Sequence, residues 1–323
     1  MRAVYVSSAT GSTYSGMFEN HIKEGYGILL HPLGKYSGNF MNDAKEGEGT
    51  LIFNDASSYN GGFQQNQFHG KGILCTKDKT VFVGDWYKGL KNGQGCETYA
   101  DGRVYRGGFQ DGQRSGMGTL CKKLGGDVIY NGSWLNGIFH GEGMCMQMQP
   151  YDDTESSEMS ENQKELQYQG LFFGGLRHGY GVLVNECKGI ILKGNWHKNK
   201  TINGKWRIEY PDGSIYSGDA KVIQDLHPEN RDEDFSLLVD LSKPEAPFVH
   251  TPTPHGFGAL RLSNADVYIG QFKDGKRMGL GSLFTPGGVK LEGNWENDNL
   301  VVDDKVSTLA EFSDIHDGSF ESK

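Results

Sequence analysis

Four histidines occupy the same place in a recurring pattern, each directly before a Gly-x-Gly sequence. They are His69, His140, His178 and His255. Stacked imidazoles bind a metal such as Zn²⁺ only when several ligands lie within a few ångströms, with thiolates or carboxylates in support. Asn92, Ser115 and Met278 occupy the equivalent places in other repeats, which interrupts any such ladder. The pattern therefore favours turn residues that bond to local backbone, and it predicts no metal site.

Other residue types with chemical potential lack the partners they would need. The five cysteines form no CxxC pair and are not spaced as zinc ligands. No serine lies in a GxSxG sequence, and the glycines are not followed by the helical period that phosphate-binding loops require. Basic residues are too sparse for a nucleic-acid groove. The sequence predicts no catalytic residue, no cofactor, no nucleic-acid partner and no enzymatic activity.

These residues are positioned by a repeat of about 23 residues, which opens with Tyr-x-Gly-x-aromatic and closes with Gly-x-Gly. The openings begin at Tyr14, Tyr36, Tyr59, Phe82, Tyr105, Tyr130, Tyr168, Leu192, Tyr216, Tyr268 and Leu291. In the eighth repeat Leu192 replaces the tyrosine and Trp206 replaces the second glycine. The ninth repeat has Ala220 in place of its aromatic. Eleven openings in phase indicate a repeat architecture.

The spacing within the repeat predicts β-strands. Residues i, i+2 and i+4 of a strand share one face, so Tyr36, Gly38 and Phe40 point the same way. A ring from one hairpin is expected to lie over the glycine backbone of its neighbour, and the other face to be polar and solvated. Short connections such as Asp101-Gly102 make consecutive strands antiparallel neighbours. The predicted fold class is all-β, an extended single-layer antiparallel β-meander or solenoid of hairpins.

The sequence Tyr59-x-Gly-x-Phe followed by His69-Gly-x-Gly resembles the MORN (membrane occupation and recognition nexus) repeat. The resemblance covers roughly residues 11 to 295, apart from two insertions. MORN repeats occur in membrane tethers, in some enzymes, in radial-spoke heads of cilia and in cytoskeletal rings. Because repeats fill this chain, the resemblance implies a freestanding, non-catalytic scaffold that binds proteins in the cytoskeleton, in the axoneme of a cilium or flagellum.

The predicted organisation has seven segments. They are an N-terminal half repeat (1–13), repeats one to six (14–150), an acidic loop insert (151–167), repeats seven to nine (168–220), an acidic, proline-containing insert (221–254), the end of repeat nine to repeat eleven (255–302) and an acidic C-terminal tail (303–323). Residues 151–165 and 222–254 contribute −5 each to the net charge of −9, and the tail contributes −4. The repeats therefore carry +5.

Two partner classes follow from these segments. The second insert contains an apolar patch, which is either a lid on the array or a docking motif for a partner protein. Its residues are Phe235, Leu237, Leu238, Val239 and Leu241. The alternative function is a peripheral membrane protein that binds acidic phosphoinositides through the repeats, with Lys276 and Arg277 as lipid contacts. The scattered basic residues favour the scaffold, and a subunit that regulates an enzyme is a third alternative.

Assembly and location can also be predicted. An open meander leaves unpaired strand edges, so either the tail from Leu300 folds back as a cap or the C-terminal repeats form a homodimer. No signal peptide is evident, and no apolar run reaches the roughly 18 residues of a membrane helix. The prediction is a cytoplasmic, cytoskeletal protein.

Overall fold

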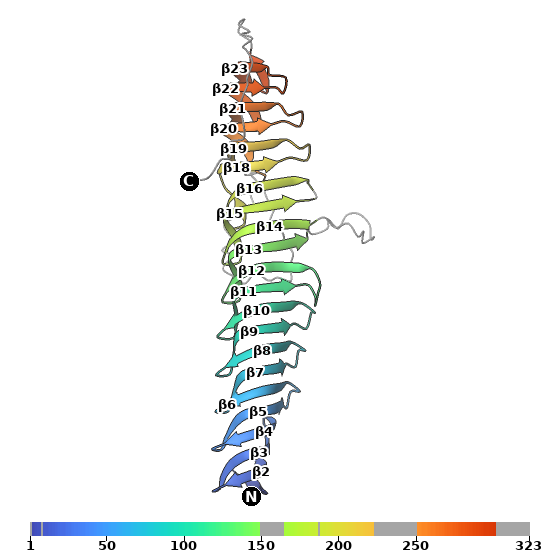
Figure 1. Ribbon diagram of the computed structural model, residues 1–323, viewed down its shortest axis with the longest axis vertical. Coiled ribbons are helices and arrows are strands. Elements are labelled where there is room, and N and C mark those ends of the chain that lie inside the picture. Colours follow the sequence, from blue (N-terminus) through green and yellow to red (C-terminus); the bar gives the residue numbers. More distant parts are fainter. Residues whose placement is uncertain (1, 8, 149–164, 187, 223–250, 302–323) are drawn as a thin grey trace, which may run out of the picture. The chain divides into compact units, whose positions relative to one another are not determined.

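The computed structural model describes residues 2–7, 9–148, 165–186, 188–222 and 251–301. These ranges contain 24 β-strands and no helix (Figure 1). They divide into two compact units, Met1–Cys145 (unit 1) and Met146–Lys323 (unit 2). In each unit, antiparallel strands pair with the strands before and after them in sequence. The predicted all-β class and hairpin meander are confirmed.

Unit 1 contains the strands of the first six repeats. They are β1 (Arg2–Ser7), β2 (Ser12–Glu19), β3 (Ile22–His31), β4 (Gly34–Met41), β5 (Ala44–Phe53), β6 (Ser58–Gln64), β7 (Gln67–Cys75), β8 (Val81–Tyr87), β9 (Leu90–Thr98), β10 (Val104–Gln110), β11 (Gln113–Cys121), β12 (Val128–Leu135) and β13 (Ile138–Met148), which ends beyond the unit boundary. The first, β1, pairs with β2 along its whole length. It therefore stands where the second strand of a preceding hairpin would lie.

Unit 2 contains the remaining repeats. Its strands are β14 (Glu165–Phe173), β15 (Leu176–Asn185), β16 (Ile190–His197), β17 (Lys200–Thr201), β18 (Gly204–Glu209), β19 (Ile215–Lys221), β20 (Thr253–Arg261), β21 (Val267–Lys273), β22 (Lys276–Phe284), β23 (Lys290–Glu296) and β24 (Asn299–Val301). Although the second insert separates β19 from β20 in sequence, the two strands pair directly. The insertion thus leaves the hairpin of the ninth repeat intact.

The tyrosine ring of each regular repeat lies over the glycines of its own hairpin. Gly38 and Gly49 face each other across β4 and β5, and a Cβ built on Gly49 would lie 2.5 Å from the Tyr36 ring. The prediction that a ring covers the glycines of a neighbouring hairpin is therefore wrong for the opening tyrosine, although the third-position ring of Phe109 does reach Gly95 of the preceding hairpin. The tyrosine ring leans along its own strand over residue i+2 and the strand paired with it, whereas sequence spacing alone does not say which glycine it reaches.

The tyrosine hydroxyl bonds to the backbone at a bulge in its own strand. The register shifts between the glycine and the third-position aromatic, as between Gly38 and Phe40, so the residue between them forms a β-bulge. Tyr36 Oη donates to the carbonyl of this bulged residue, Asn39, at 2.9 Å. Seven other repeats have the same bond, from Tyr14, Tyr59, Tyr105, Tyr130, Tyr168, Tyr216 and Tyr268. Burial raises the pKa of Tyr59 to about 12, so its hydroxyl stays protonated at neutral pH.

The third-position aromatic joins one repeat to the one before it. Phe40 packs edge to face on Tyr14 of the preceding repeat, with ring centroids 5.0 Å apart. Where this residue is tryptophan, as at Trp134, its Nε1 also donates to the carbonyl of the preceding second glycine, Gly118, at 3.0 Å. These contacts make the aromatic core of unit 1 continuous from repeat to repeat. In unit 2 the row is interrupted at the ninth repeat, where Ala220 takes the place of the third-position aromatic.

The eighth repeat supplies its ring from the opposite strand. Leu192 has no ring to cover Gly194, and the Trp206 indole lies there instead: a Cβ on Gly194 would lie 2.5 Å from it. Trp206 also packs edge to face on Trp196 at 5.7 Å. The two departures from the repeat therefore compensate for each other: the ring that Leu192 lacks is supplied by Trp206.

Candidate interaction surface

The face of the sheet that bears the tyrosine rings, the tyrosine face, is covered by a second row of side chains. This row stands nine residues after each opening and is mostly basic or aromatic: Lys23, Lys45, Phe68, Lys91, Arg114, Phe139, Arg177, Thr201, Arg277 and Leu300. The Arg114 guanidinium lies 5.6 Å from the Tyr105 centroid and 4.5 Å from that of Trp134, a cation–π arrangement. Phe68 instead stacks flat on Tyr59 at 3.7 Å. The basic side chains of this row are thus part of the packing.

The two predicted lipid contacts differ in what they touch. Arg277 belongs to the covering row: its side chain is only 18% exposed, it lies 4.6 Å from the Trp295 centroid, and it pairs with Asp298 at 3.3 Å. Lys276 begins β22 and is exposed to solvent. The guanidinium is therefore held by groups of the protein itself, whereas the ammonium is free to meet a ligand. Lipid contact at the pair stays a prediction.

The opposite face, which we call the variable face, is less polar than predicted. Its most exposed row is the residue between the two glycines of Gly-x-Gly, the variable position. In the second, third, fourth and sixth repeats this residue is polar: Glu48, Lys71, Gln94 and Glu142. In five others it is large and apolar, with exposed fractions of 51% for Tyr26, 65% for Met117, 58% for Tyr180, 59% for Phe257 and 70% for Leu280. The expectation of a uniformly wet face is wrong, because the glycines fix which face the intervening side chain points to but not its chemistry.

The apolar side chains of the variable face are densest on β20–β22. Phe257, Ile269, Leu280 and Phe284, which we call the C-terminal patch, line a hollow of about 370 Å³. Phe257 pairs across the strands with Gln271, and Ile269 pairs with Ser282, so the four apolar residues are diagonal neighbours. In unit 1, by contrast, polar pairs such as Asn60 Nδ2 to Thr50 Oγ1 at 2.7 Å separate the apolar residues.

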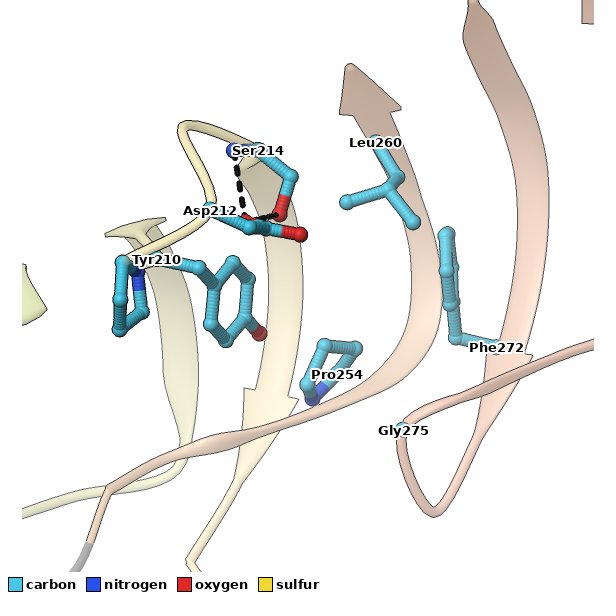
Figure 2. A pocket seen from close by; sticks show the side chains of 8 residues that line it. Tyr210, Asp212, Ser214, Pro254, Leu260, Phe272 and Gly275 are labelled. Atoms are coloured by element: carbon cyan, nitrogen blue, oxygen red, sulfur yellow. Dashed lines mark hydrogen bonds between the residues drawn. The ribbon is translucent and has the colours of Figure 1, made fainter. Parts of the chain in front are cut away.

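A second hollow, of about 470 Å³, opens on the tyrosine face between β18 and β21 (Figure 2). Its lining includes Tyr210, Pro254, Leu260 and Phe272. It lies in the ninth repeat, where Ala220 replaces the third-position aromatic and Pro254 stands two residues before Gly-x-Gly, in place of a long side chain. The missing ring and missing long side chain leave the space open, and these two substitutions were the sequence signal for it.

The polar groups beside this hollow bond to one another. Asp212 Oδ1 accepts from Ser214 N at 2.9 Å and from Ser214 Oγ at 2.7 Å, as drawn in Figure 2. The bond from the Ser214 hydroxyl, with that from its amide, lowers the pKa of Asp212. The Asp212 carboxylate is therefore engaged by the backbone and side chain of its own turn.

The predicted histidines lie in local contacts. His178 faces His197 with centroids 5.0 Å apart, and His255 Nδ1 lies 3.7 Å from Asp274 Oδ1. Within the part of the chain that the structure describes, no three His, Cys, Asp or Glu side chains are grouped as a metal site would require. The same ranges contain no helix long and apolar enough to cross a membrane. The predicted docking patch at Phe235, Leu237, Leu238, Val239 and Leu241 lies outside the described residues.

Comparison with known families agrees with this geometry. Eight segments match the MORN repeat: residues 14–32, 36–58, 59–81, 82–102, 105–122, 130–146, 168–185 and 268–289. The chain is a MORN repeat protein. The repeats without a match open at Leu192, Tyr216 and Leu291, and each lacks either its tyrosine or its third-position aromatic. MORN repeats are generally non-catalytic and suggest a protein that binds other proteins or a membrane. A comparison with curated proteins gave no match.

Proposed function

We propose that this MORN protein is a non-catalytic scaffold that binds other proteins across its variable face. The observation that carries the proposal is the set of five large apolar side chains at the variable position, each exposed by 51% or more. Exposed apolar side chains that gather on a protein surface often mark a site where another molecule binds. A repeat array that presents such a side chain on several of its hairpins offers a docking surface within each unit.

The alternative, a peripheral membrane protein, would need basic side chains free to meet anionic headgroups. On the tyrosine face these charges already serve the fold, as Arg177 does over Trp196 at 4.9 Å. Others on the variable face are paired, as Lys193 is with Glu209 at 2.8 Å. Each basic residue near an anionic surface contributes only about 1 kcal/mol, so a few free lysines give weak attachment. These pairings support a protein partner over a lipid.

The setting we propose is the cytoplasm and its cytoskeleton, in the axoneme of a cilium or flagellum. The support is the resemblance to freestanding MORN arrays of radial-spoke heads and cytoskeletal rings, together with a chain largely made of repeats. Immunofluorescence in ciliated cells of the source organism tests it directly. Staining along the axoneme is expected, and diffuse or plasma-membrane staining would count against this setting.

Partner and lipid binding can be separated in one experiment. The tagged chain is used to capture proteins from a cell extract, and in parallel it is sedimented with vesicles that contain phosphatidylinositol bisphosphate, an anionic lipid of the cytoplasmic leaflet. Changing Tyr26 and Met117 to serine should remove specific partners and leave sedimentation unchanged. Changing Lys276 and Arg277 to alanine should leave both the captured partners and the vesicle sedimentation unchanged. Vesicle binding that depends on the lysine and arginine, with no protein lost from the serine variant, would favour the membrane function instead.

A further inference from the structure

The C-terminal patch is an apolar surface without a cover in the described part of unit 2. Leu280 is 70% exposed, Phe257 59% and Ile269 41%, and they surround the hollow on β20–β22. Strands β20, β21, β22 and β23 pair in order. The patch therefore lies on three neighbouring strands, β20, β21 and β22, and is not a set of isolated side chains.

Basic residues surround this patch on the same face. Alternation along each strand puts Arg261, Lys273, Lys276 and Lys290 on the variable face with Leu280. The acidic residues on the same face are Glu292 and Glu296 of β23, of which Glu292 pairs with Lys290, and Asp219 of β19, which lies beside Gly256. The rim of the patch is thus net positive, so its complement is an acidic segment that carries apolar side chains.

The chain leaves the described part of unit 2 beside the patch. Val301 ends β24 and pairs with Asn294, which in turn pairs with Leu280. Two strand spacings separate Val301 from Leu280, or about 10 Å. Residues 302–308, when extended, reach roughly 23 Å. A segment that starts near residue 309 can therefore reach every side chain of the patch.

Residues 302–323 have the chemistry that the patch requires. They contain six acidic and two basic residues, and apolar residues stand among the acids. Leu309 and Phe312 are two of these, with Glu311 and Asp314 beside Phe312. We propose that residues 302–323 bind the C-terminal patch of their own chain, with Leu309 and Phe312 against Leu280 and the acidic side chains toward its basic rim.

This contact would give the C-terminal end of the array a built-in competitor. A partner that binds the variable face at Phe257 or Leu280 must displace the tail, whereas one that binds at Met117 need not. A short tether keeps the tail at an effective concentration in the millimolar range, so even weak binding in trans is strong in cis. Tail binding itself does not depend on the proposed scaffold function.

The test uses a fluorescent peptide of residues 302–323 and measures its anisotropy. Three chains are compared: the full chain, a chain ending at Val301, and a full-length chain with Leu309 and Phe312 changed to serine. The peptide should bind the shortened chain and the serine variant at least about tenfold more tightly than the full chain, because the tail in cis occupies the site. Leu280→Ser in the shortened chain should abolish binding.

Met117→Ser is the matched control, because Met117 occupies the same position in unit 1 and is 65% exposed. It should leave peptide binding unchanged, and melting curves confirm that each variant folds. Equal peptide affinity for the full and shortened chains, or no binding to either, would overturn the proposal. If no peptide binds, and light scattering shows that the shortened chain forms a dimer that Leu280→Ser prevents, then a second copy of the chain covers the patch. If the shortened chain instead sediments with anionic vesicles and Leu280→Ser prevents this, then a lipid surface covers the patch.

Discussion

The two faces of the same strands differ in how much the repeat constrains them. On the tyrosine face, Tyr105 is fully buried, and its ring, its hydroxyl and the glycines beneath it recur from repeat to repeat. On the variable face, the residue beside those glycines ranges from Lys71 to Leu280. The alternation of a strand lets one face hold the fold while the other changes freely. The comparison teaches that positions fixed by the fold and positions free to vary alternate along each second strand.

The largest effect is expected at the exchanged ring of the eighth repeat. Trp206→Gly should destabilise unit 2 by about 4 kcal/mol, because it removes a buried ring and leaves a cavity. Leu192→Tyr alone should also destabilise, since two rings would compete for the space over Gly194. The double variant recreates a regular repeat and should recover at least half of the loss. Urea unfolding of the three variants measures their stability. If the double variant lost as much stability as the two single variants together, Trp206 would not be replacing the missing ring of Leu192.

A slightly smaller effect is expected for a β-carbon on the tyrosine face. Gly118→Val should lower the free energy of unfolding by about 3 kcal/mol, because the new side chain would overlap the Tyr105 ring. A Cβ at this position would lie 2.6 Å from Cε2 of that ring. The adjacent residue Met117 points to the variable face, so Met117→Val should change stability by less than about 0.5 kcal/mol. The pair is compared by the urea midpoint. Equal midpoints for the two variants would contradict the difference between the faces.

The hydroxyl bond gives a smaller, reciprocal prediction. Tyr59→Phe leaves the Gly62 carbonyl without its donor and should destabilise by about 1 kcal/mol. Phe82 is the natural exception, so Phe82→Tyr can supply the missing donor to the bulged Asp85 and should stabilise by a similar amount or less. Thermal melting measures both. A destabilised Phe82→Tyr variant would mean that this repeat closes its bulge in another way.

How far the sequence predicts this molecule depends on the face. The Tyr-x-Gly-x-aromatic spacing predicts the strands and the tyrosine face because steric rules act over two to four residues. The exchange between Leu192 and Trp206 could not be predicted, since it depends on which residue of β18 lies opposite Gly194. The apolar variable positions can be identified in the sequence as the residue between the two glycines of Gly-x-Gly. The repeat pattern alone, however, does not indicate what that residue does. The hollow beside Pro254 likewise appears only where two neighbouring substitutions meet in space.

The central claim is that the variable positions bind partners without supporting the fold. The most direct test changes Tyr26, Met117, Tyr180, Phe257 and Leu280 together to serine. A control changes Leu33, Leu124 and Val289, which are 72%, 65% and 52% exposed but lie in the connections between strands. Proteins captured by each variant are then quantified by mass spectrometry beside its urea midpoint. We expect the first variant to lose the specific partners with an unchanged midpoint and the control to keep them. Partners retained by the first variant, or lost together with stability, would contradict the account.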